Sequence, residues 1–98
     1  MANLKSLPVG DKAPKVVHMV IEVPRGSGNK YEYDPDLGAI KLDRVLPGAQ
    51  FYPGDYGFIP STLAEDGDPL DGLVLSTYPL LPGVVVEVRV VGLLLMED

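Results

Sequence analysis

The chain has no cysteine, few basic residues and no long apolar run, and each absence excludes a class of protein. Without cysteine, its 98 residues can form neither a disulfide framework nor a thiolate metal site, which fits a reducing, cytoplasmic location. Lys and Arg total 8 against 14 Asp and Glu, and the net charge of −6 is opposite to that of a general nucleic-acid-binding surface. Residues 1–10 lack the apolar core of a signal peptide, and Glu87 and Arg89 interrupt the apolar C-terminal part. We therefore expect a cytoplasmic protein with no nucleic-acid or membrane partner.

Helical periodicity is also missing. No window of about 12 residues carries the apolar stripe of an amphipathic helix, and 10 prolines and 11 glycines separate short segments of alternating polarity. The segments expected to form strands are residues 16–23, 30–33, 39–42, 73–76 and 84–91. Short strands at regular spacing favour a closed or nearly closed antiparallel barrel, which also protects apolar strand edges. We expect a single domain over residues 1–98, with an irregular lead-in at 1–14 and an aromatic loop at 51–60.

An acidic turn at residues 65–71 is the segment most suggestive of chemistry. Asp66, Asp68 and Asp71 lie within six residues, around a glycine and a proline. Carboxylates held this close repel one another unless a cation neutralises them, and their oxygens suit Mg²⁺, Mn²⁺ or Ca²⁺. An EF-hand is excluded, because Asp71 stands where that loop requires glycine and Thr77 where it requires a bidentate carboxylate. The alternative is an acidic surface turn.

Other polar side chains recur on strand faces and loops where a core would not need them. They are the acids Glu22, Glu32, Asp55, Asp66, Asp68, Asp71 and Asp98, the cations Lys30 and Arg44, and the hydroxyl donors Tyr52 and Tyr56. Taken together, hard-cation carboxylates beside Lys, Arg and Tyr suit a polyanionic, phosphate-containing substrate. Taken singly, Lys30 and Glu32 are also compatible with a solvated strand face, and the tyrosines with half-buried aromatics.

Four motifs in one order resemble the soluble family I inorganic pyrophosphatases. They are Glu22-Val-Pro-Arg-Gly followed by Asn29-Lys-Tyr-Glu-Tyr-Asp34, Leu42-Asp-Arg44, Phe51-Tyr-Pro-Gly-Asp-Tyr-Gly57, and the family signature Asp66-Gly-Asp-Pro-Leu-Asp71. The resemblance covers residues 15–98 and is to bacterial members of thermophilic type. It implies an OB-type, five-stranded antiparallel barrel, dependence on Mg²⁺ (or Mn²⁺ or another divalent cation), and hydrolysis of pyrophosphate to two phosphates by a metal-activated water. It also implies a homo-oligomer, which is a hexamer in bacterial relatives.

The same resemblance implies a role for each matching residue. Asp66, Asp71 and Asp98 match metal ligands, Asp68 the general base near the attacking water, Lys30, Arg44 and Tyr56 phosphate binders (Tyr56 also a catalytic residue), and Glu22, Glu32, Tyr52 and Asp55 supporting positions. Family members continue well past the position of Asp98, with a further metal-binding aspartate, phosphate-holding residues and helices that cover the barrel. The resemblance therefore predicts that this chain lacks the C-terminal part of the family domain and hydrolyses pyrophosphate poorly.

Two other classes of protein stay open from the sequence. One is a non-catalytic OB-type module that binds oligonucleotides through aromatic side chains such as Tyr31 and Phe58, although such modules use a basic groove. The other is a self-associating scaffold or folding fragment. Salt-sensitive binding of single-stranded DNA without Mg²⁺ would favour the first, and a defined assembly in light scattering the second.

Overall fold

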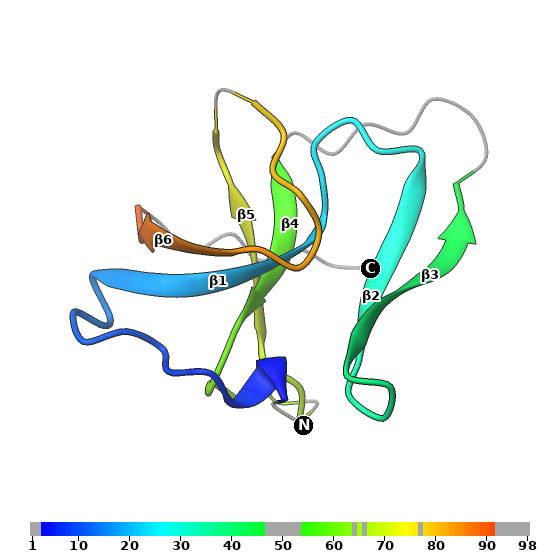
Figure 1. Ribbon diagram of the computed structural model, residues 1–98. Coiled ribbons are helices and arrows are strands. Elements are labelled where there is room, and N and C mark those ends of the chain that lie inside the picture. Colours follow the sequence, from blue (N-terminus) through cyan, green and yellow to red (C-terminus); the bar gives the residue numbers. More distant parts are fainter. Residues whose placement is uncertain (1–2, 47–53, 64, 66, 77, 92–98) are drawn as a thin grey trace.

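The computed structural model describes residues 3–46, 54–63, 65, 67–76 and 78–91, and these form an all-β structure. In chain order the elements are the 3₁₀ helix η1 (Leu4–Ser6) and the strands β1 (Val16–Val23), β2 (Asn29–Asp34), β3 (Ala39–Val45), β4 (Asp55–Ile59), β5 (Leu70–Val74) and β6 (Val85–Arg89) (Figure 1). All strand pairs are antiparallel, so the predicted all-β, OB-type class is confirmed. No helix in the described part of the chain is long and apolar enough to cross a membrane.

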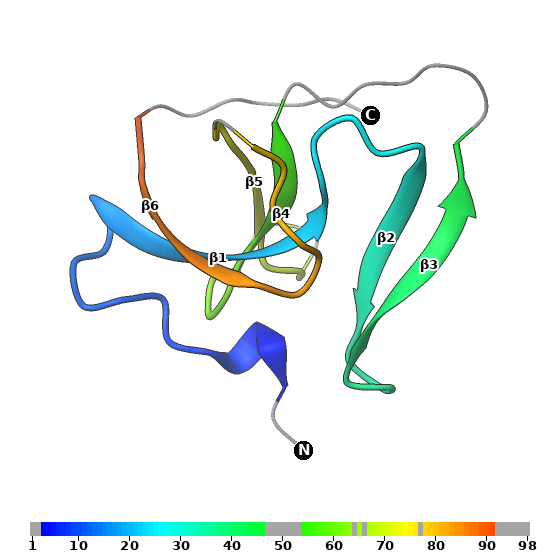
Figure 2. The same cartoon turned by 45° about the horizontal axis from the view of Figure 1, so that its top comes forward.

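The strands form two sheets rather than one continuous five-stranded layer. A four-stranded sheet has the order β5-β4-β1-β6, and β2 and β3 pair separately as a hairpin. Figure 2 shows the hairpin standing beside the larger sheet, joined to it by the segment that leaves β1. The described residues therefore contain six strands, and the space between the two sheets is where side chains from both can meet.

The prediction for residues 51–60 was wrong over its described part. Instead of an aromatic loop, Asp55–Ile59 form β4, which lies between β1 and β5. The glycines that suggested a loop permit a close approach of strands: a Cβ at Gly57 would lie 2.0 Å from the carbonyl oxygen of Val20. The strand expected at 73–76 likewise begins earlier, since β5 is Leu70–Val74 and includes Asp71 of the acidic turn.

The core extends over both faces of β1. The alternation of residues 16–23 predicts one apolar face with Val17, Met19, Ile21 and Val23, yet Val20 and Glu22 of the other face are buried as well. Val20, Tyr33 and Phe58 form an apolar cluster, with the Tyr33 and Phe58 ring centroids 5.9 Å apart. The partly buried Leu4, Leu7 and Ile40 pack against this cluster. The cluster therefore joins the four-stranded sheet, the hairpin and the N-terminal lead-in. The hairpin and the lead-in pack on the side of β1 that carries Val20.

Candidate functional site

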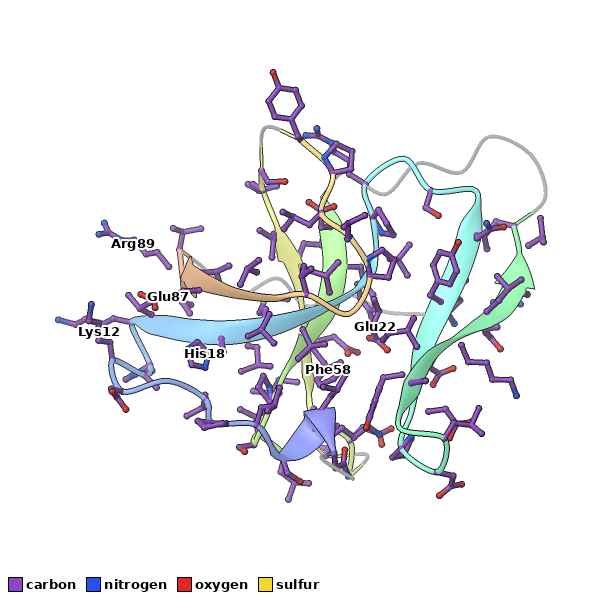
Figure 3. The ribbon with its side chains drawn as sticks, viewed as in Figure 1. Lys12, His18, Glu22, Phe58, Glu87 and Arg89 are labelled. Atoms are coloured by element: carbon purple, nitrogen blue, oxygen red, sulfur yellow. The ribbon has the colours of Figure 1, made fainter. Side chains whose placement is uncertain are left out.

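A cavity of about 150 Å³ lies between the two sheets and collects most of the described site residues. Its lining comprises Lys5 of η1, Glu22 of β1, Lys30, Tyr31, Glu32 and Tyr33 of β2, Tyr56 and Phe58 of β4, Asp68 and Pro69, and Asp71 of β5. In Figure 3, Glu22 and Phe58 lie where the four-stranded sheet faces the hairpin. The structure thus brings together six predicted residues from distant parts of the sequence: Glu22, Lys30, Glu32, Tyr56, Asp68 and Asp71.

Five predicted residues are not in this lining. Tyr52, Asp66 and Asp98 lie outside the described residues. Arg44 is exposed on β3, directly opposite Lys30 in the hairpin, and does not line the cavity. Asp55 is fully buried and belongs to a different set of contacts.

Glu22 is a buried acid of the cavity with a raised pKa. Its side chain is buried, and Oε2 accepts a 2.8 Å hydrogen bond from the backbone N–H of Tyr33. Burial raises the pKa of Glu22 to about 7, and the charges of Asp71 and Glu32 act in the same direction. The hydrogen bond from Tyr33 and the charge of Lys5 oppose this rise in pKa without cancelling it. The mutual repulsion of these carboxyl groups means that a cation in the cavity would be favoured.

The acids of the cavity have the donor chemistry of a magnesium site. Glu22, Glu32, Asp68 and Asp71 all offer carboxylate oxygens, the ligands that hard divalent cations prefer. Among the described residues, however, no group of three or more His, Cys, Asp or Glu side chains is arranged to hold a metal ion. The donor type therefore fits Mg²⁺, and the described acids by themselves do not complete a metal site.

Lys30 enters the cavity beside a bulge in the hairpin. Lys30 pairs with Arg44 and Tyr31 with Leu42, so Asp43 is an extra residue on β3. The Lys30 Nζ lies 3.7 Å from Asp43 Oδ2, and both side chains are partly exposed. An exposed ion pair of this length is weak, about 0.2–1 kcal/mol. The ammonium of Lys30 can therefore exchange Asp43 for a phosphate oxygen at little cost.

Asp55 anchors loops and does not contribute to the cavity lining. Its carboxylate accepts hydrogen bonds from the backbone N–H groups of Arg25 and Leu80, each 2.9 Å, and from the Ser76 hydroxyl at 2.7 Å. Burial alone would raise the pKa of Asp55, but these three hydrogen bonds outweigh it, and the pKa lies below its usual value. The supporting position predicted for Asp55 is thus a buried anchor between β4 and two loops.

Lys5 is a cavity residue that sequence reasoning missed. Its Nζ lies 3.8 Å from Asp68 Oδ1, and Lys5 lines the cavity with the predicted residues. It falls in the lead-in that was expected to be irregular, and no motif surrounds it. The only signal in the sequence is the pair Leu4 and Leu7, whose apolar side chains dock the segment against the core.

Comparisons with known proteins identify the family. Residues 19–98 match the family model of inorganic pyrophosphatase. The chain is 99% identical over 98 residues to the inorganic pyrophosphatase of Thermus thermophilus, covering all of this chain and 56% of the relative. It is 57% identical over 89 residues to that of Sulfolobus acidocaldarius, covering 91% of this chain and 51% of the relative.

A solved structure shows the same fold. The crystal structure of inorganic pyrophosphatase from Thermus thermophilus superimposes with a TM-score of 0.88 at 99% sequence identity, covering 91% of this chain and 51% of that one. The chain spans about half the length of the curated relatives it matches. Since the family model matches most of the sequence and six of the motif residues line one cavity, the chain belongs to the inorganic pyrophosphatase family.

Proposed function

We propose that the protein hydrolyses inorganic pyrophosphate to two phosphates in a Mg²⁺-dependent reaction at the cavity between the two sheets. The observation that carries this proposal is the composition of the lining, in which four carboxylates, two lysines and the Tyr56 hydroxyl meet. Carboxylate oxygens are ligands for divalent cations, and ammonium and hydroxyl groups bind phosphate oxygens, so the lining offers partners for both. The relatives, which are named inorganic pyrophosphatases, support the choice of substrate.

The residues divide into four proposed roles: metal ligands, general base, phosphate binders and supporting residues. Asp66, Asp71 and Asp98 would hold Mg²⁺ (or Mn²⁺), which when bound would lower the pKa of a water and offset phosphate charge. Asp68, exposed at the cavity, would accept the proton of the attacking water as general base.

The phosphate oxygens of the substrate would be bound by Lys30, Arg44 and Tyr56, with the Tyr56 hydroxyl as a hydrogen-bond donor. Glu22, Glu32, Tyr52 and Asp55 would support the site. Glu22 and Glu32 would do so by adding negative charge that favours a cation in the cavity, and Asp55 by fixing the start of β4.

We also propose that these 98 residues hydrolyse pyrophosphate more slowly than the longer Thermus relative. In the described cavity two lysines face four carboxylates, so the substrate's negative charge is poorly compensated. Stabilisation of the charge that develops in the transition state is usually the largest catalytic contribution. Losing one hydrogen-bond donor to that charge typically lowers the catalytic rate by on the order of 10²–10³.

The proposed location of the protein is the cytoplasm, and its proposed assembly is a homo-oligomer.

The test is phosphate release from pyrophosphate with and without millimolar Mg²⁺, measured for the chain beside its Thermus relative. Asp71→Asn is the site variant and Asp36→Asn, in the exposed turn between β2 and β3, is the matched control. We expect phosphate release that depends on Mg²⁺ and is slower for this chain than for its Thermus relative. Asp71→Asn should reduce the rate of release at least tenfold, and Asp36→Asn should leave it unchanged. Phosphate release that needs no divalent cation, or equal effects of the two substitutions, would contradict the proposal.

A further inference from the structure

Lys5 brings a second cation into the cavity from an element outside the family motifs. Lys30 reaches the cavity from β2, whereas Lys5 reaches it from η1 on the side of Asp68. The Lys5 side chain is 30% exposed and that of Asp68 is 68% exposed. The ammonium therefore lies at the cavity surface, accessible to a ligand that enters from solvent.

The backbone around Lys5 is held in place without any help from its charge. The N–H of Leu4 donates to the Tyr33 hydroxyl at 3.0 Å, and the N–H of Ser61 donates to the carbonyl of Lys5 at 2.8 Å. The Ser61 hydroxyl donates to the carbonyl of Leu7 at 2.7 Å. Leu4 and Leu7 also pack against the Val20 cluster. The segment is thus anchored on both sides of Lys5, so the backbone position from which the Lys5 ammonium extends is fixed.

The ion pair with Asp68 does not explain why a lysine is positioned here. At 3.8 Å between partly exposed groups, this ion pair is weak, and its gain is small beside the apolar packing of Leu4 and Leu7. The same ammonium would gain more from a ligand that carries several negative charges, because three donors can then meet phosphate oxygens.

We propose that Lys5 is a phosphate-binding residue of the cavity, contacting the substrate from η1 on the side of Asp68. This inference rests on the proposed function, since it takes pyrophosphate as the ligand. It makes the N-terminal segment part of the binding site, with Leu4 and Leu7 as its anchor and Lys5 as its functional side chain.

The test measures binding of imidodiphosphate, a non-hydrolysable pyrophosphate analogue, by calorimetry with Mg²⁺ present. The variants are Lys5→Ala, Lys5→Arg and, as a control with the same charge change, Lys12→Ala. Lys12 belongs to the same lead-in but lies at the far end of β1 from Glu22 (Figure 3). Losing a charged hydrogen bond predicts about tenfold weaker binding in Lys5→Ala. We expect near recovery in Lys5→Arg and no change in Lys12→Ala, with urea midpoints alike in all four proteins.

The outcomes separate this inference from the proposed function. Unchanged affinity in Lys5→Ala, or equal losses in Lys5→Ala and Lys12→Ala, would overturn the role of Lys5 and leave pyrophosphate hydrolysis standing. A wild-type chain that binds the analogue through Lys5 but releases no phosphate from pyrophosphate would overturn the hydrolysis and keep the binding residue. A wild-type chain that does not bind the analogue at all would overturn both.

Discussion

Two buried acids of this protein differ in the direction of their pKa shifts, and the difference lies in hydrogen bonding and in the neighbouring charges. Glu22 accepts one backbone N–H and lies near other carboxyl groups, so burial prevails and the pKa rises. Asp55 accepts two backbone N–H groups and a hydroxyl, and the charge of Arg25 acts in the same direction, so its ionised form is favoured in spite of burial. Hydrogen-bond donors and the sign of the nearby charges therefore decide which form of each acid the fold stabilises.

The raised pKa of Glu22 predicts a specific dependence of stability on pH. Between its ordinary value of 4.5 and about 7, the folded chain holds a proton on Glu22 that the unfolded chain has lost. Stability from this group is therefore greatest below pH 4.5 and falls as the pH rises to 7, by up to about 3 kcal/mol. Glu22→Gln removes the titration, so its free energy of unfolding relative to wild type should rise over this window. Urea unfolding at several pH values without Mg²⁺ measures it.

The matched control for Glu22→Gln is Glu87→Gln, on the exposed face of β6 at the other end of β1 (Figure 3). Its pH profile of stability should run parallel to that of the wild type. A Glu22→Gln profile that also runs parallel would show that Glu22 does not titrate in this window. Added Mg²⁺ should flatten the wild-type profile, because a nearby cation favours the ionised carboxylate.

At the scale of elements, β4 is the strand on which the site depends most. It places Tyr56 and Phe58 in the cavity lining and pairs with both β1 and β5, which carry Glu22 and Asp71. Gly57 lies between the two lining residues, where β4 and β1 approach too closely for any side chain. The close pairing of β4 with β1 depends on this contact.

Gly57→Ala should therefore destabilise the whole sheet. The added Cβ would lie 2.0 Å from the Val20 carbonyl oxygen, so one of the two strands must move. We expect a loss of about 3 kcal/mol or more in the free energy of unfolding, in the range of severe core substitutions. Urea denaturation checks this, with Gly28→Ala as control, since a Cβ there meets nothing within 4 Å. Similar midpoints for the two variants would show that the pairing of β1 and β4 can relax.

Across the whole molecule, contacts between residues far apart in sequence hold the two sheets and the loops together. The Asp55 carboxylate reaches Arg25 after β1 and Ser76 and Leu80 after β5, and the Arg25 Nη1 donates to the Ser76 carbonyl at 2.6 Å. One side chain at the start of β4 therefore fixes two connections at once. Removing the charge of Asp55 should therefore weaken both connections as well as β4.

Asp55→Asn should lower the free energy of unfolding by about 2–4 kcal/mol near neutral pH. The amide oxygen can still accept from the N–H groups of Arg25 and Leu80, which both donate to Oδ1. Its NH₂ group, however, replaces the Oδ2 that accepts from the Ser76 hydroxyl, and the negative charge that strengthens all three hydrogen bonds is lost. Because the pKa of Asp55 is lowered, the wild-type advantage exists above the ordinary value of 3.8 and should shrink in more acidic solution. Thermal unfolding of this variant beside Asp36→Asn measures the difference. A loss no greater than that of Asp36→Asn would mean that the loops are held by other contacts.

Features that depend on neighbours along the chain can be predicted from local sequence patterns. The β2–β3 hairpin follows from two alternating segments around Asp34–Gly38, where Asp34 Oδ1 accepts from the N–H groups of Asp36 and Leu37. The alternation in β6, with Glu87 and Arg89 exposed, is equally local. The family motifs likewise indicated six of the residues that line the cavity, because each motif is a short continuous string.

Features that depend on pairing between distant segments follow from the fold and cannot be predicted from these local patterns. The Gly57 contact that makes β4 a strand needs the Val20 carbonyl of β1. The burial of Glu22 needs the hairpin, and the presence of Lys5 in the cavity needs Ser61 and Tyr33 to hold η1. Local sequence patterns encode which face a side chain occupies and where the chain turns. They carry no information on what packs against that face, and burial, pKa and the charge of the cavity all follow from that packing.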